Sequence, residues 1–266
     1  MPELIVHSDK HDLAYAPSWD LGGDRFLGPG HERVLDTIGE IAGLLYTEDA
    51  QKLYELAWFT PGPVLEIGTF HGQSTAVMAM ALAAAGNPAP IVSADVDGES
   101  LAAARSNLDR LGMGGRVTLV HGDARSLLRS LPGLRPGLVF VDGDHTLRGV
   151  LADLRALRPA VPRGSIVVLH DYEGYEAEDP YSVRVAEAAS RSWLATEAEF
   201  IGRFGLSGVF VRRSGGPGSP GGADTLGDPL LVLESRWSAR RRALEGAARK
   251  LDRHLFHLRR RVAVGD

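Results

Sequence analysis

Short apolar runs alternate with helical patterns through the middle of the chain. The runs are continuous rather than alternating, which is typical of parallel strands that are covered on both faces. Between them, apolar residues recur at the spacing of amphipathic helices. This alternation predicts a doubly wound sheet with helices on both faces. The predicted strands are residues 64–67, 91–94, 117–120, 138–141 and 166–169, and the predicted helices are residues 74–85, 100–111, 124–131 and 147–157.

Further elements are predicted on both sides of this region. Apolar residues keep a helical spacing from 32 to 59, and Thr47, followed by Ala50 and Gln51, indicates a helix start. A helix is expected at about 183–194. Runs 200–204 and 208–211 flank Gly205 and predict an antiparallel hairpin. The predicted fold class is therefore α/β, with a mostly parallel, seven-stranded Rossmann-like sheet that ends in an antiparallel hairpin.

The ends of the chain differ from this region in composition. Residues 1–43 contain glycine-rich stretches and scattered aromatic residues and are predicted to form a loop-rich N-terminal cap, followed by the main domain at 44–213. Residues 214–228 have the composition of a Gly/Pro-rich linker. Residues 229–266 predict a basic amphipathic helix whose apolar seam begins at Trp237. We expect that seam to pack on the domain or to form a homo-oligomer, and binding to an anionic surface is the alternative.

Charge and cysteine content narrow the classes of function. The net charge is −5, but residues 229–266 carry ten Lys/Arg and four Asp/Glu, so this segment has +6 and the rest has −11. An acidic body argues against a nucleic-acid partner. The absence of cysteine excludes disulfides and thiolate chemistry. No apolar run is long enough for a membrane span, and no signal-peptide pattern is present, so we expect a cytoplasmic protein.

A glycine-containing turn follows the first predicted strand, in the segment VLEIGTFHGQS at 64–74. Glycines let the backbone approach a ligand closely, and a helix N-terminus offers free N–H groups. The dinucleotide fingerprint is absent because Phe70 and Gln73 replace its glycines, and a phosphate-binding P-loop would need a lysine. A tight turn without a ligand is the alternative. The remaining pattern is Glu-x-Gly-x-x-x-Gly-x-Ser, formed by Glu66, Gly68, Gly72 and Ser74.

Acids and histidines follow the other predicted strands. Asp95 ends the second strand, where a carboxylate can accept both hydroxyls of a ribose, and Asp97 is expected to cap the next helix. Asp123 after the third strand is either a second helix cap or a ligand contact. Open α/β sheets bind ligands at the carboxyl ends of their strands. The fourth and fifth strands place there Asp142, His145, His170 and Asp171.

Together these motifs resemble class I S-adenosylmethionine-dependent methyltransferases, in the small-molecule branch similar to catechol and macrocin-type O-methyltransferases. The resemblance covers about residues 44–212 and implies S-adenosylmethionine as the cofactor of the main domain. The Asn/Asp-Pro-Pro-aromatic motif of nucleic-acid base methyltransferases is absent, which argues against base N-methylation. The branch that the chain resembles implies a hydroxyl on a sugar or natural product as the acceptor. The implied cofactor residues are Glu66, Gly68, Thr69, Phe70, Gly72, Ser74, Asp95, Asp123, Ala124 and Asp142.

The same branch implies a divalent metal, Mg²⁺ or Mn²⁺, at the positions of Asp142, His170 and Asp171. His170 stands where the family usually has Asp, and imidazole favours Mn²⁺, Fe²⁺ or Zn²⁺ over Mg²⁺. Alternatively, Glu173 or Asp144 completes the ligand set, or no metal is used. His145 is the candidate catalytic base, because imidazole titrates near neutral pH.

Other interpretations remain open for the function and for the flanking residues. Some sequences of similar pattern are metal-dependent hydroxylases of the cephalosporin-hydroxylase-like type. A non-catalytic S-adenosylmethionine-binding module that works through its basic helix is a third possibility. His71 is interpreted as a residue that shapes the glycine loop. Tyr172, Tyr175 and Tyr181 either line the acceptor pocket or pack in the fold.

Overall fold

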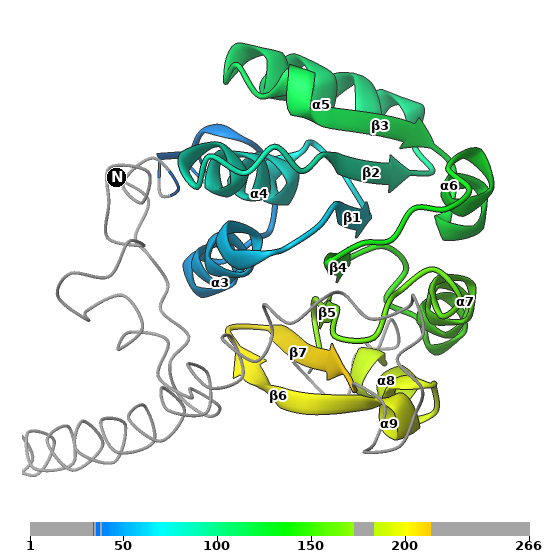
Figure 1. The fold of residues 1–266 in the computed structure, drawn as a ribbon. Helices are drawn as coiled ribbons and strands as arrows, with labels where there is room; N and C mark the ends of the chain where they lie inside the picture. The colour runs from blue at the N-terminus through cyan, green and yellow to red at the C-terminus, as the bar shows by residue number, and fades with distance from the viewer. Residues whose placement is uncertain (1–33, 35, 38, 173–183, 214–266) are drawn as a thin grey trace, which may run out of the picture.

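The computed structural model describes residues 34, 36–37, 39–172 and 184–213, and it contains one seven-stranded sheet in these residues (Figure 1). The strand order is β3-β2-β1-β4-β5-β7-β6. The first five strands are parallel, whereas β7 runs antiparallel to both β5 and β6, which confirms the predicted fold class. The strands are β1 (Val64–Ile67), β2 (Ile91–Asp95), β3 (Val117–His121), β4 (Leu138–Val141), β5 (Ile166–Leu169), β6 (Ala198–Phe204) and β7 (Ser207–Arg212).

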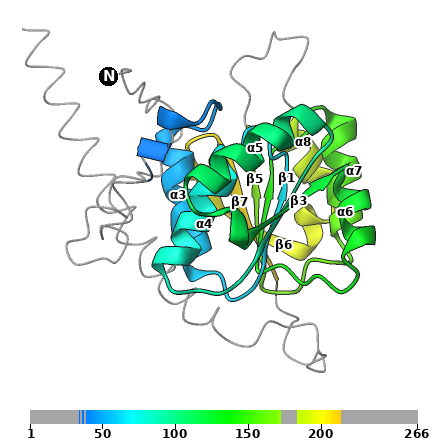
Figure 2. The same cartoon turned by 90° about the horizontal axis from the view of Figure 1, so that it is seen from above.

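Helices cover both faces of the sheet, as the view from above shows (Figure 2). Alternate side chains of each strand point to opposite faces, so each covered strand contributes to two separate cores. Phe140 and Val168 belong to the core with α3 and α4, while Val141 and Leu169 belong to the core with α7 and α8. The helices are α3 (Thr47–Phe59), α4 (Gln73–Ala84), α5 (Gly98–Arg110), α6 (Ala124–Ser130), α7 (Leu147–Leu157), α8 (Val185–Ser190) and α9 (Leu194–Glu197), with a 3-10 turn η2 (Gly114–Arg116).

Two local expectations are wrong. The helix expected at 183–194 is broken into α8 and α9, because the chain turns between them to bury Trp193, whose indole N–H donates to the Leu154 carbonyl at 2.7 Å. Strand β3 is not covered on both faces; only Val117 is fully buried, since β3 lies at the edge of the sheet. Both differences depend on which segments pack against the one in question, and the local hydrophobic pattern of a segment does not contain this information.

The first described residues pack against α4. Val34 and Ile41 are buried in the core, and the Thr37 hydroxyl donates to the Met80 sulfur at 3.1 Å. The Gln73 side chain accepts from the Leu45 N–H and donates to the Ile41 carbonyl, both at 3.0 Å. This packing fixes the start of α4, which directly follows the glycine loop.

Several predicted segments lie outside the described residues. They are residues 1–33 of the predicted cap, the linker at 214–228 and the basic helix at 229–266. The predicted domain boundaries therefore stay predictions. Within the residues that the structure describes, no helix has the length and apolar character needed to cross a membrane.

Candidate functional site

The loop after β1 lies directly on the backbone at the end of β4. The Gly68 N–H donates to the Ala94 carbonyl at 2.8 Å, and the Asp142 N–H donates to the Ile67 carbonyl at 2.7 Å. Gly68 has a φ of +94°, and a Cβ added there would lie 2.0 Å from the carbonyl oxygen of Asp142. Only glycine fits a position with this conformation and this close backbone approach.

Glu66 supports the loop from beneath. Its carboxylate is completely buried and accepts hydrogen bonds from the hydroxyls of Ser74 (2.5 Å), Thr75 (2.5 Å) and Ser93 (2.6 Å). Burial raises the pKa of Glu66 to about 7, although the three hydroxyl donors oppose the rise. The Thr69 hydroxyl is also buried and lies 2.5 Å from that of Ser93. In this structure Glu66, Ser74 and Thr69 therefore join the loop to α4 and β2.

Asp95 forms hydrogen bonds with the exposed part of the same loop. Its Oδ2 accepts the Phe70 N–H at 2.7 Å, and its Oδ1 accepts the Asp97 N–H at 2.9 Å. Phe70 has a φ of +44° and is half exposed, with its ring stacked on His71. The structure thus brings the predicted ribose-binding acid to the glycine loop.

Asp97 and Asp123 cap helices. The Asp97 carboxylate accepts the N–H groups of Glu99 and Ser100 at the start of α5, which confirms the predicted cap. Asp123 accepts the Ser126 N–H at 2.8 Å at the start of α6, and the hydrogen bonds from Ser126 lower its pKa. The cap alternative for Asp123 is therefore present, and the cofactor contact of Asp123 and Ala124 stays a prediction.

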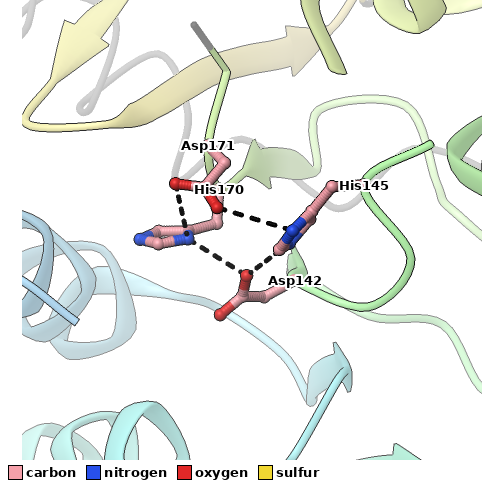
Figure 3. Close-up of side chains that lie close together, drawn as sticks. All are labelled: Asp142, His145, His170 and Asp171. Carbon is pink, nitrogen blue, oxygen red and sulfur yellow. Dashed lines mark hydrogen bonds and ion pairs between the residues drawn. The ribbon is translucent and has the colours of Figure 1, made fainter. Parts of the chain in front are cut away.

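Four side chains converge at the carboxyl ends of β4 and β5 (Figure 3). His145 Nε2 lies 3.1 Å from Asp142 Oδ1, and His145 Nδ1 lies 3.5 Å from Asp171 Oδ2. His170 Nδ1 lies 3.0 Å from Asp142 Oδ1 and 3.6 Å from Asp171 Oδ1. One potential ligand atom from each of the four residues lies within 4.8 Å of the others. The three predicted metal ligands and the predicted base thus form one group, the Asp–His cluster.

Electrostatic interactions in the Asp–His cluster are strong because His170 is buried and the other three side chains are only partly exposed. Burial would raise the pKa of Asp142, but His170 and His145 outweigh it and lower that pKa. Burial would lower the pKa of His170, yet the carboxylates of Asp142, Asp49 and Asp171 raise it to about 10. The hydrogen bond with Asp142 raises the pKa of His145 against the effect of burial. Positive charge is therefore strongly stabilised at this place.

The environment of the His170 ring indicates whether the residues of this site fit a metal. Its side chain is 5% exposed, and neither ring nitrogen forms a hydrogen bond of normal geometry in the described part of the chain. Buried polar atoms are rarely left without partners. The carboxylates of Asp142 and Asp171 together with the imidazole of His170 suit Mn²⁺, Fe²⁺ or Zn²⁺ better than Mg²⁺. The residues present therefore fit a divalent transition metal.

The remaining candidates lie elsewhere or have other contacts. Asp144 accepts the Thr146 N–H at 2.8 Å and is not among the clustered ligands. Tyr172 stacks on Phe200 with ring centroids 5.3 Å apart and also meets Phe210, which are packing contacts. Glu173, Tyr175 and Tyr181 lie outside the described residues.

Sequence reasoning missed Asp49. This acid lies in the first turn of α3, where acidic residues are common, so nothing in the local pattern singles it out. In the fold it is completely buried, and its Oδ2 lies 3.9 Å from His170 Nε2.

Comparisons with known proteins agree on the class. Residues 65–172 match a family model described as a methyltransferase domain. The chain is 28% identical over 168 residues to rhamnosyl O-methyltransferase of Mycobacterium leprae, covering 58% of this chain and 72% of that protein. Among solved structures, cofactor-bound Rv0187 from MTB is 25% identical with a TM-score of 0.55, covering 75% of this chain and 95% of its own.

A second solved structure shares the fold. The O-methyltransferase from Bacillus cereus, in complex with SAH, is 18% identical with a TM-score of 0.53, covering 74% of this chain and 96% of its own. The chain thus carries a methyltransferase domain, and it is an enzyme of the S-adenosylmethionine-dependent methyltransferase class.

Proposed function

We propose that this protein transfers a methyl group from S-adenosylmethionine to a hydroxyl of a small molecule of the sugar or natural-product type, with the help of a divalent metal. The observation that carries the proposal is the Asp–His cluster, in which the buried His170 imidazole faces two carboxylates and its ring nitrogens form no hydrogen bond of normal geometry within the described residues. The relative that is a rhamnosyl O-methyltransferase supports a sugar hydroxyl as the acceptor.

The proposed cofactor side is formed by the loop after β1 and the ends of β2 and β3. Phe70 is half exposed there, Asp95 accepts the Phe70 N–H, and Glu66 supports the loop from the buried side. The caps Asp97 and Asp123 accept the N–H groups of Glu99, Ser100 and Ser126, so these three donors are not free to bind a ligand. In this proposal Gly68, Gly72 and Ala124 act through their small size.

The proposed metal ligands are Asp142, His170 and Asp171. When bound, the ion supplies positive charge that lowers the pKa of a substrate hydroxyl and orients its oxygen. Asp171 reaches the cluster from a residue with a φ of +48°, a conformation that Asp tolerates better than most residues. Asp142 and Asp171 follow the adjacent parallel strands β4 and β5, so their carboxylates lie at the same end of the sheet.

His145 is the proposed general base. Its side chain is 34% exposed, far more than that of His170, so an acceptor hydroxyl can reach it. The Asp142 carboxylate holds one ring nitrogen, and stabilises the imidazolium that forms when the other nitrogen takes the hydroxyl proton.

The test is a transfer assay with methyl-labelled S-adenosylmethionine and a panel of rhamnosides, other sugars and catechols, run with chelator and with added Mn²⁺, Zn²⁺ or Mg²⁺. We expect labelled O-methyl product with a sugar acceptor, lost with chelator and restored best by Mn²⁺ or Zn²⁺. Label on nitrogen, or transfer that is unchanged by chelator, would contradict the hydroxyl acceptor or the metal, respectively.

One feature favours a second candidate, the metal-dependent hydroxylase. Two histidines with a carboxylate are the donors that non-haem iron oxygenases use, and His145, His170 and Asp142 supply this set. Bound iron, oxygen consumption and a hydroxylated product without methyl transfer would favour it. Cofactor binding without any product would leave the non-catalytic module. A cytoplasmic location, Mg²⁺ as the ion and an oligomer through the C-terminal helix stay predictions.

A further inference from the structure

Asp49 is the one buried carboxylate that approaches the Asp–His cluster from α3. The side chain has no exposed surface, and its Oδ2 lies 3.9 Å from His170 Nε2. Asp142 and Asp171 lie near the other ring nitrogen, Nδ1. Figure 3 shows this arrangement of the imidazole, with one nitrogen turned to the two acids of the cluster and the other turned away.

The other contacts of Asp49 hold it rigidly in place. Its Oδ1 accepts the Leu206 N–H at 3.1 Å, from the β6–β7 turn, and the Ser207 hydroxyl at 2.6 Å, from the start of β7. A Cβ at Gly205, which has a φ of +60°, would lie 2.6 Å from Oδ2. The turn therefore closes over the carboxylate, and Oδ2 faces the imidazole with only a long contact of 3.3 Å to the Leu206 N–H.

The His170 ring has a limited choice of orientation. Phe140 meets it edge to face, with centroids 6.0 Å apart and an interplanar angle of 74°. If Nδ1 binds an ion, the imidazole must be neutral and must carry its proton on Nε2. Metal-binding histidines generally donate that second N–H to a carboxylate or carbonyl, which sets the tautomer and the ring orientation. Asp49 Oδ2 is the carboxylate oxygen on that side.

We propose that Asp49 is a positioning residue: when Nδ1 of His170 binds the metal, the imidazole turns so that its Nε2–H group, whose nitrogen now lies 3.9 Å from Asp49 Oδ2, donates to that carboxylate. The inference rests on the metal site of the proposed function and extends it by a residue from a different part of the fold. It also joins metal binding to the β6–β7 turn, because the same carboxylate holds that turn through Leu206 and Ser207.

The test measures Mn²⁺ binding by calorimetry to the full chain, with Ser207→Ala as the matched control. Asp49→Asn should raise the Kd for Mn²⁺ by about 10- to 100-fold, the usual effect of losing such a partner. Ser207→Ala also loosens the β6–β7 turn but keeps the carboxylate, so its Kd should stay close to that of the wild type. The affinity for S-adenosylmethionine should be unchanged in both variants, which separates a positioning role from general damage to the fold.

Each outcome decides the role of Asp49. An unchanged Kd in Asp49→Asn, with Mn²⁺ binding intact in the wild type, would overturn the inference and leave the proposed function standing. Absence of Mn²⁺ and Zn²⁺ binding to the wild type would overturn both. Equal losses in Asp49→Asn and Ser207→Ala would assign Asp49 a purely structural role.

A second measurement needs no Asp49 variant and holds if Asp49→Asn fails to fold. In Zn²⁺-loaded wild type, ¹⁵N NMR should show the His170 proton on Nε2, assigned by its loss in His170→Asp. A proton on Nδ1 in the Zn²⁺-loaded protein would overturn the inference.

Discussion

The loop after β1 and the Asp–His cluster lie side by side at the carboxyl ends of the parallel strands. They differ in how completely their buried polar groups are hydrogen-bonded. Beneath the loop, three hydroxyls donate to Glu66, and backbone N–H groups donate to Asp95. In the cluster, both ring nitrogens of the buried His170 lack normal hydrogen bonds in the described residues. A satisfied network is a rigid support, whereas an unsatisfied buried group indicates where a ligand belongs.

Gly68 is the place where the two regions touch. A Cβ added at Gly68 would lie 2.0 Å from the Asp142 carbonyl oxygen, so a shift of the loop would also move the first acid of the cluster. A mutation can therefore affect one region without the other only if the mutated residue takes no part in this contact.

The largest expected effect is that of Asp142→Asn. Loss of this charge removes a contact shared by both histidines, so kcat/KM for methyl transfer should fall by roughly 10³-fold, which corresponds to several kcal/mol of charge stabilisation. The measurement is a labelled-methyl assay with saturating Mn²⁺. Asp144→Asn, two residues away and outside the cluster, is the control and should stay near wild-type activity. Equal losses in both variants would mean that Asp144 belongs to the ligand set.

Gly68→Ala tests the contact between the regions. The added methyl would meet the Asp142 carbonyl, so the free energy of unfolding should fall by about 3 to 4 kcal/mol more than in Gly86→Ala. Gly86 also has a positive φ, of +64°, but no atom lies within 4 Å of the position that an added Cβ would take, so the control isolates the clash. Urea denaturation measures both variants, and similar losses would show that the loop can move away from β4.

Glu66→Gln tests the support beneath the loop through its pH dependence. The folded-state pKa is raised from 4.5 to about 7 by burial, so the folded protein keeps a proton that the unfolded chain releases between these values. This contribution to stability is complete below pH 4.5 and is lost as pH rises through about 7. Glu66→Gln has no carboxyl to ionise and does not lose this stability. Its free energy of unfolding relative to that of the wild type should therefore rise by about 3 kcal/mol from pH 4.5 to above pH 7.

Denaturation of both proteins across this range measures that difference. A difference that stays constant with pH would show that Glu66 keeps an ordinary pKa in the folded protein.

The smallest expected effect is that of His145→Gln. Loss of a general base should lower kcat by about 10²-fold. The Kd for Mn²⁺, measured by calorimetry, should hardly change, because His145 is proposed as the base and not as a ligand. A Kd that rises together with the loss of kcat would place His145 in the metal shell instead.

Local sequence patterns were sufficient to predict most of the fold. The apolar runs at β1, β4 and β5 have the predicted bounds, and the hairpin turns at Gly205 as expected, because hydrophobic period and turn residues are local properties. The break before α9 was missed, since it depends on Trp193 packing against α7. The exposed face of β3 was missed because strand order decides which strand lies at an edge.

The candidate site could be predicted in part for a similar reason. The four residues of the Asp–His cluster all follow parallel strands whose carboxyl ends lie at the same end of the sheet, so topology alone brings them together. Asp49 was not predictable, because it reaches His170 from a helix on one face of the sheet. The hydrogen bonding of the buried Glu66 carboxylate was not predictable either, because one of its donors, Ser93, lies on a neighbouring strand.

The most direct test of the account is calorimetric titration with S-adenosylmethionine of the chelator-treated wild type and of Asp95→Ala. If the loop after β1 holds the cofactor and the Asp–His cluster serves the acceptor, the wild type should bind without metal, and Asp95→Ala should lose most of that affinity. No binding to the wild type, with or without metal, would contradict the proposed methyl transfer at its first step.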